Sequence, residues 1–231
     1  EAPTPLIADI HFDHRLALGA LKAGVDGLRI NPGNIGGEAA VAKVVHAAAE
    51  RGVPIRIGVN SGSLDKDLLQ RYGGPTPEAM VESATRQTEL LESLDYHEIK
   101  ISLKSSDVLT MVEAYRLLAH RVSYPLHLGV TEAGTVVSGT AKSAIGIGLL
   151  LAEGIGDTIR VSLTSDPIDE VKAAYEILRA LKLRERGVEI ISCPTCGRCK
   201  INLFDIVECV EKTLITKTLP IKLAIMGCVV N

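Results

Sequence analysis

Short apolar, β-branched runs alternate along the chain with longer segments whose apolar positions recur at helical spacing. The short runs predict strands at residues 5–11, 27–32, 54–60, 98–104, 125–131, 158–164, 188–192 and 221–227. The longer segments predict helices at residues 14–23, 38–51, 77–94, 107–121, 140–153, 168–182 and 203–214. A strand followed by a helix, repeated in this way, indicates an α/β fold with a parallel sheet and right-handed crossovers.

The predicted strands carry polar residues on one face, although the strands of a parallel sheet are usually apolar throughout. In residues 54–60, Arg56 and Asn60 share one face because side chains alternate across a strand. The same alternation selects Asp9, His11, Arg29, Asn31, Lys100, Ser102, Lys104, Arg160, Ser162 and Thr164. Cations are costly to bury under helices, so we expect these faces to line a barrel lumen. Converging cations and neutral donors suit a polyanion such as a diphosphate.

Other interpretations of these polar residues stay open. The cations could instead form ion pairs inside the barrel, for example Arg29 with Asp9, and this alternative weighs more for Lys100 and Arg160. Residues 31–37 follow a strand and open a helix, so their N–H groups could face a phosphate, although the segment lacks a GxGxxG or P-loop pattern.

Two acid–base candidates lie at the ends of predicted strands. Glu132 follows the strand at 125–131, where it could act as an acid or base or cap the next segment. His11 is either a donor to substrate or a structural residue.

The cysteines indicate metal or redox chemistry. Cys193 and Cys196 follow one predicted strand, and Cys228 follows another, as expected for thiolates that share a metal ion or an iron–sulfur cluster. Cys199 is either a third ligand or a bystander, and we favour the bystander. Cys209 lies in an apolar-periodic helix, which predicts a small core residue.

Composition and the length of the apolar runs argue against a nucleic-acid-binding protein and against a membrane-spanning one. The net charge of −3 gives no global field for nucleic acid, so an anion site has to be local. No run of about 18 apolar residues occurs, so no membrane span is expected. We see no signal peptide before Glu1, and we expect the sequence to be a fragment that lacks both termini.

Six segments together resemble the hydroxymethylbutenyl diphosphate synthase (GcpE) family: residues 8–13, 28–34, 55–60, 126–134, 193–196 and 227–231. The resemblance covers nearly the whole chain in order. It implies a TIM-type (β/α)8 barrel followed by a smaller α/β iron–sulfur domain. Residues 1–184 would then carry barrel strands 3–8, and residues 185–231 the beginning of the cluster domain, so the eight strands counted above would not form one barrel.

The resemblance also implies a [4Fe–4S] cluster held by Cys193, Cys196 and Cys228, with a glutamate beyond Asn231 as the fourth ligand. It implies reductive ring opening and dehydroxylation of 2-C-methyl-D-erythritol 2,4-cyclodiphosphate in the non-mevalonate pathway. The implied substrate-binding residues are Arg29, Asn31, Arg56, Asn60, Lys104 and Ser162, and the implied catalytic residues are Asp9, His11 and Glu132. Ferredoxin or flavodoxin would supply electrons to a homodimer, in the bacterial cytoplasm or the plastid stroma.

Two other functions compete with this one. A phosphate- or pterin-binding barrel related to dihydropteroate synthase could carry a structural zinc ion at the cysteines. An iron–sulfur carrier or scaffold would need the cysteines alone, and it leaves the polar strand faces unexplained.

Overall fold

The structure is a computed structural model that describes residues 3–214 and 217–228. The chain divides into two compact units, residues 1–174 and residues 175–231. Within the described part of the chain, no helix is long and apolar enough to span a membrane.

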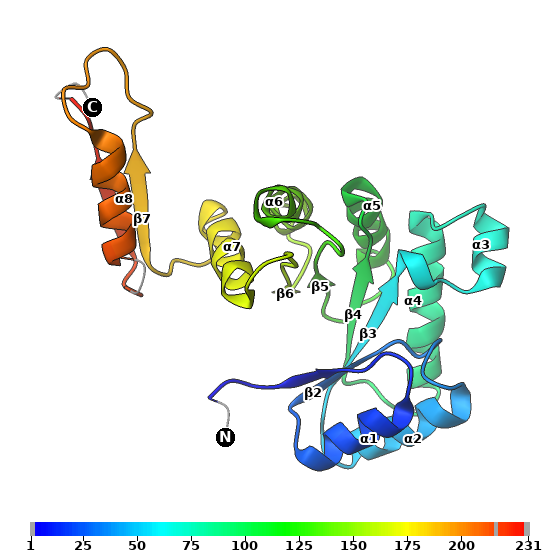
Figure 1. Cartoon of the computed structure of the whole chain (residues 1–231). Coiled ribbons are helices and arrows are strands. Elements are labelled where there is room, and N and C mark those ends of the chain that lie inside the picture. The colour runs from blue at the N-terminus through cyan, green and yellow to red at the C-terminus, as the bar shows by residue number, and fades with distance from the viewer. Residues whose placement is uncertain (1–2, 215–216, 229–231) are drawn as a thin grey trace. The chain divides into compact units, whose positions relative to one another are not determined.

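The first unit alternates strands and helices, as the sequence predicts (Figure 1). Its strands are β1 (Ile7–Asp9), β2 (Gly27–Ile30), β3 (Ile55–Asn60), β4 (Ile99–Lys104), β5 (His127–Leu128) and β6 (Thr158–Ile159). Its helices are α1 (His14–Ala23), α2 (Glu38–Ala49), α3 (Lys66–Tyr72), α4 (Pro77–Glu92), α5 (Val108–Ala119), α6 (Val136–Ala152) and the start of α7 (Pro167–Ala180). Strands β1 to β4 form one parallel sheet in chain order, and β5 pairs in parallel with β6. The predicted parallel α/β order is therefore confirmed.

The strands place apolar and polar residues on opposite faces. Ile55 and Ile57 of β3 and Ile101 of β4 are fully buried, and α4 packs against both of these strands. The register aligns Asp9 with Arg29, Arg29 with Arg56, and Arg56 with Lys100. Because paired residues of a parallel sheet point to the same side, these charged residues form one row across the sheet.

A tyrosine from α5 lies between β4 and β5. A single bridge, between Ile101 and Leu126, joins this strand pair outside the regular ladders. Two residues further along β4, the N–H of Leu103 donates to the Tyr115 hydroxyl over 2.9 Å, and that hydroxyl donates to the carbonyl of His127. The hydroxyl thus replaces a direct strand-to-strand hydrogen bond, which explains why β5 belongs to a separate ladder.

The structure differs from the sequence prediction at several elements. Strands β5 and β6 have two residues each, whereas the sequence predicts runs at 125–131 and 158–164. Helix α6 begins at Val136 instead of residue 140, because Gly139 continues the helix and allows Leu163 to pack closely against it. Helix α3 and the 3-10 turn at Ser61–Ser63 were not predicted, since short polar segments give little periodic signal.

The second unit is built from strand β7 (Val188–Ser192), helix α8 (Leu203–Leu214) and strand β8 (Ile221–Ile225). The strands pair in parallel from Val188 opposite Ile221 to Ser192 opposite Ile225. Strands β7 and β8 form a two-stranded sheet of their own. The end of α7 belongs to this unit through Arg179, which donates to the carbonyl of Arg186 over 2.6 Å.

Candidate functional site

Arg29 is held in a fixed position on the polar face of the sheet. Its side chain is 5% exposed, and its Nη1 donates to Asp9 Oδ1 over 3.0 Å and to His11 Nδ1 over 3.2 Å. Its Nη2 donates to the carbonyl of Gly58 over 3.1 Å. Since a guanidinium only donates, Nδ1 of His11 accepts, and the proton of the neutral imidazole is on Nε2. The predicted ion pair between Arg29 and Asp9 is confirmed.

Gly58 makes this placement of Arg29 possible. A Cβ atom at residue 58 would lie 2.2 Å from Nε and 2.8 Å from Cζ of Arg29. Gly58 lies on β3, next to the strand that carries Arg29, so the guanidinium lies across the backbone of its neighbour. Any larger residue at position 58 would displace the guanidinium.

Arg29, Arg56, Lys104 and Arg160, here called the cation cluster, share one electrostatic environment. Burial lowers the pKa of Arg56 to about 10, with Arg29 and Arg160 adding to the effect against the attraction of Asp9. Burial, followed by Arg160, Arg29 and Arg56, lowers the pKa of Lys104 to about 7. Burial would raise the pKa of Asp9, but Arg29 and Lys104 outweigh it, so this carboxyl has a lowered pKa.

The cation cluster has more donors than acceptors. Across residues 3–214 and 217–228, Asp9 pairs with Arg29, while Arg56, Lys104 and Arg160 form no ion pair. Nε and Nη1 of Arg56 and Nε of Arg160 are buried and have no acceptor among the described residues. Buried polar groups are nearly always paired in native proteins, so these N–H groups are available to an acceptor outside the described residues. The ion pair with Asp9 therefore accounts for Nη1 of Arg29, whereas Nε of Arg29 is also buried without an acceptor among the described residues.

His127 adds a neutral polar group to the cation cluster. Burial, with Arg56 and Arg160 as the next causes, lowers the pKa of His127 to about 3. Its Nδ1 is 2.8 Å from the Thr158 hydroxyl, and its Nε2 is buried without a partner in the described structure. Sequence reasoning did not select His127 as a site residue, although it alternates with the buried residues Leu126 and Leu128.

The amide oxygens of the two predicted asparagines accept hydrogen bonds from backbone N–H groups two residues further along the chain. Oδ1 of Asn31, a residue that is 5% exposed, accepts from the N–H of Gly33 over 3.1 Å. Oδ1 of Asn60 accepts from the N–H of Gly62 over 3.3 Å. Each NH2 group is left as a donor that suits an oxygen-rich ligand.

Two of the predicted residues, Glu132 and Ser162, form no side-chain hydrogen bond with the cation cluster in the described structure. Glu132 is exposed, has a left-handed backbone (φ 52°), and forms no side-chain hydrogen bond to any described residue. It does not cap α6, whose N-cap is Thr135, so the alternative of a capping role is wrong. Ser162 is half-buried and follows β6.

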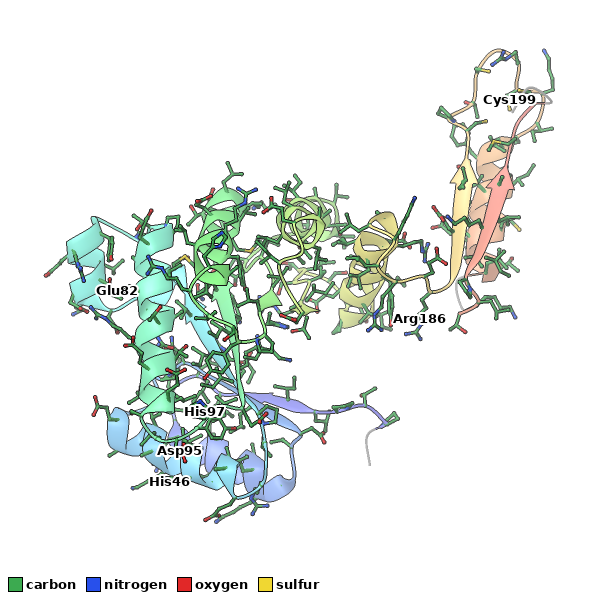
Figure 2. All side chains as sticks on the ribbon, turned by 180° about the vertical axis from the view of Figure 1, so that it is seen from behind. His46, Glu82, Asp95, His97, Arg186 and Cys199 are labelled. Atoms are coloured by element: carbon green, nitrogen blue, oxygen red, sulfur yellow. The ribbon has the colours of Figure 1, made fainter. Side chains whose placement is uncertain are left out.

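Four of the five cysteines, all except Cys209, line one cavity at the carboxyl ends of β7 and β8. The cavity has a volume of about 200 Å³ and is lined by Cys193, Pro194, Thr195, Cys196, Arg198, Cys199, Gly227 and Cys228. Figure 2 shows Cys199 on the loop beyond the tips of these strands. The sequence prediction that Cys193, Cys196 and Cys228 come together is consistent with this lining.

Backbone N–H groups favour the thiolate form of two of these cysteines. The N–H groups of Gly227 and Thr195 lower the pKa of the Cys193 thiol. The backbone and side chain of Arg198 lower the pKa of the Cys196 thiol. Thiolates are the form that binds metal, so the lowered pKa of these two thiols favours metal binding.

The donor set of this cavity fits a metal group. Among the described residues, no three His, Cys, Asp or Glu side chains converge on one metal-ion position. The four thiols that line the cavity are the type of donor that holds an iron–sulfur cluster, and a structural zinc ion takes the same donors.

The remaining cysteine predictions have different outcomes. Cys199 lies in the cavity lining, half-buried, where it could be either a ligand or a bystander near the cluster. Cys209 is exposed, so its prediction as a core residue is wrong. Of the described residues of α8, Leu203 is the one that is buried, because β7 and β8 leave most of the helix uncovered.

Comparison with known proteins gives consistent results. Residues 1–175 match the family described as GcpE TIM-barrel domain, and residues 189–231 match GcpE protein C-terminal domain. The chain is 63% identical over 231 residues to "4-hydroxy-3-methylbut-2-en-1-yl diphosphate synthase (flavodoxin)" of Geobacter sulfurreducens, covering 100% of this chain and 65% of that relative. It is also 63% identical over 227 residues to the protein of the same name from Thermodesulfovibrio yellowstonii, covering 98% of this chain and 65% of the relative.

Among solved structures, a 2,3-dimethylmalate lyase is 13% identical with a TM-score of 0.49, covering 84% of this chain and 66% of that one, which adds nothing to the assignment. The two family matches cover most of the chain, in the order barrel and then C-terminal domain. The chain therefore belongs to the GcpE family.

Proposed function

We propose that this chain carries the substrate-binding surface and the iron-binding cysteines of a 4-hydroxy-3-methylbut-2-enyl diphosphate synthase of the non-mevalonate (MEP) pathway. The observation that carries the proposal is the cation cluster, in which buried N–H groups of Arg56 and Arg160 have no acceptor among the described residues. The chain spans 65% of the length of the relatives from Geobacter and Thermodesulfovibrio, so the activity proposed is that of the whole protein. Residues 1–184 would supply barrel strands 3–8, and residues 185–231 would begin the cluster domain.

The proposed substrate is 2-C-methyl-D-erythritol 2,4-cyclodiphosphate. Arg29, Arg56 and Lys104, with Arg160 added from the geometry, would bind the phosphate oxygens through charge-assisted hydrogen bonds. The NH2 groups of Asn31 and Asn60 and the hydroxyl of Ser162 would complete the binding surface. The same cations would stabilise the negative charge that develops on the phosphate oxygen as the ring opens.

The proposed reaction consumes two electrons and one proton. The bond between a ring carbon and a phosphate oxygen breaks, a hydroxyl group leaves as water, and a carbon–carbon double bond forms. Glu132, exposed and without a partner among the described residues, would give a proton to the leaving hydroxyl. Asp9 stays ionised beside Arg29 and fixes its orientation, and His11 would donate from Nε2 to the substrate.

Cys193, Cys196 and Cys228 would hold a [4Fe–4S] cluster, with a glutamate from outside this sequence as the fourth ligand. When bound, the cluster supplies the two electrons one at a time. The relatives' name specifies flavodoxin, which supports flavodoxin as the donor, with ferredoxin as the alternative. A homodimer and a location in the bacterial cytoplasm or the plastid stroma stay predictions.

The test is calorimetric titration of the cyclodiphosphate into the chain, with variant Arg56→Gln compared with Arg86→Gln. Arg86 is a matched control because it lies on the surface, paired with Asp67 and Glu82. We expect Arg56→Gln to weaken binding by at least about tenfold, as for loss of a charged hydrogen bond, and Arg86→Gln to have no effect. Equal affinity in both variants, or no binding by the folded chain, would reject the proposal.

A further inference from the structure

Cys199 brings an additional thiol into the cysteine-lined cavity. Its Sγ donates to the carbonyl of Ile201 over 3.3 Å, which holds the side chain within its own loop. A Cβ atom on Gly227 would lie 2.5 Å from this sulfur, so the thiol packs directly against the glycine. Gly227 is buried and immediately precedes Cys228. The thiol of the β7 loop is therefore in contact with the segment that carries the cysteine of the β8 loop.

A hydrogen-bonded turn brings Cys199 back to Cys196. The N–H of Cys199 donates to the carbonyl of Cys196 over 2.9 Å. The turn follows Thr195, which has a left-handed backbone with φ of 62°. Together these features direct the whole segment from Cys193 to Cys199 around one cavity. The proposed function uses three of the cysteines that line it and leaves Cys199 without a role.

We propose that Cys199 is an additional iron ligand, whose thiolate binds the iron atom of the cluster that no other cysteine holds. The inference rests on the proposed cluster in this cavity. The thiol of Cys199 would lose its proton and its hydrogen bond to Ile201 as the sulfur binds iron. Water or a carboxylate would leave that iron and take up the proton. No electron is transferred, so the exchange needs no oxidant or reductant.

The test compares Cys199→Ser with Cys209→Ser after anaerobic reconstitution of the chain with iron and sulfide. Cys209 is a matched control because it is an exposed cysteine on α8 that does not line this cavity. The first measurement is the rate at which a chelator removes iron. We expect Cys199→Ser to lose iron about ten to a hundred times faster than the parent chain, and Cys209→Ser to match the parent.

The second measurement is alkylation of each thiol in the loaded parent chain, followed by mass spectrometry, with Mössbauer spectra of both variants. We expect Cys199 to be protected like Cys193, Cys209 to be labelled, and one iron site to change in Cys199→Ser. Labelling of Cys199 as fast as Cys209, with unchanged iron retention and spectra in Cys199→Ser, would overturn the inference while leaving the proposed cluster in place. If the parent chain and Cys193→Ser both fail to take up iron, the proposed function fails as well.

Discussion

The hydroxyl of Tyr115 donates to the carbonyl of His127, in the gap where β4 and β5 stop pairing directly. The same hydroxyl accepts from the N–H of Leu103, so one buried side chain serves two strands. A helix residue thus sets the spacing of two strands whose polar faces carry Lys104 and His127. The local geometry of the candidate site depends on this contact.

Tyr115→Phe should destabilise the protein by about 1–3 kcal/mol, because it leaves a buried N–H and a buried carbonyl unpaired. The free energy of unfolding in urea measures the effect. Tyr124→Phe is the control, since the Tyr124 hydroxyl donates to Glu92 at an exposed position, and its change should stay within about 0.5 kcal/mol. Equal stability of the two variants would mean that the hydroxyl contributes nothing between the strands.

Gly58→Ala should weaken the binding of inorganic pyrophosphate while the protein stays folded. The new methyl group would lie 2.2 Å from Arg29 Nε, too close for contact, and the guanidinium would move away from Asp9. We expect affinity to fall by about tenfold, as for a lost charged hydrogen bond. Gly19→Ala in α1 is the control, because its Cβ would meet nothing within 4 Å. Unchanged affinity in Gly58→Ala would show that Arg29 does not bind the anion.

The affinity for pyrophosphate should fall as pH rises through about 7, because burial and neighbouring cations lower the pKa of Lys104 to about 7. The protonated amine binds the anion, and the bound anion raises the pKa again, so binding at pH above 7 takes up a proton. Titration calorimetry in buffers with different ionisation enthalpies measures this uptake. In Lys104→Met the uptake should disappear, and if it persists, another group is responsible.

Lys104 also has a defined effect on folding stability. Its pKa is about 7 in the folded chain and 10.5 for an unperturbed lysine, so the unfolded chain binds more protons between these values. The stability contribution of Lys104 therefore rises with pH across that window and is lowest below pH 7, where the buried amine is charged. Lys104→Met should be more stable than the parent at pH 6, and the difference should shrink by pH 10. Denaturant unfolding at several pH values would show it.

Glu132→Gln in the full-length enzyme should retain substrate binding and lose turnover by about a hundredfold or more, as expected for removal of a general acid. Binding calorimetry and product formation, followed by phosphorus NMR, separate the two effects. Glu89→Gln is the control, an exposed carboxylate on α4. A parallel loss of binding and turnover would instead give Glu132 a role in binding.

The alternation of residues along β3 and β4 was sufficient to predict the polar face of the sheet. Arg56 and Asn60 on one strand and Lys104 on the next are aligned by a register that follows from a period of two. The βαβ order likewise predicted α1, α8 and β7 with the bounds that the structure has. Local periodicity carries this information even for α8, where Leu203 is the one buried residue among the described residues.

Contacts between distant segments could not be predicted in this way. Tyr115 fits the apolar pattern of α5, and nothing in that pattern places its hydroxyl between two strands. From the sequence alone, Gly58 would be expected to destabilise its strand. The structure shows that the missing Cβ makes room for the guanidinium of Arg29. Cys209 fits the apolar period of α8, but no described element covers it. For Tyr115 and Gly58 the deciding contact is with a residue remote in sequence, and for Cys209 it is the lack of a covering element in the described part of the chain.

Some N–H groups of Arg56 and Arg160 have no acceptor among the described residues, and this affects the stability of the protein in different buffers. Mutual repulsion within the cation cluster raises the free energy of the ligand-free folded state, and any anion that fills the gap lowers it in proportion to the logarithm of its concentration. Melting temperatures should therefore differ between phosphate and uncharged amine buffers at the same ionic strength. Sequence changes that neutralise these arginines would give a more heat-resistant protein with poorer anion recognition, so selection for one property acts against the other.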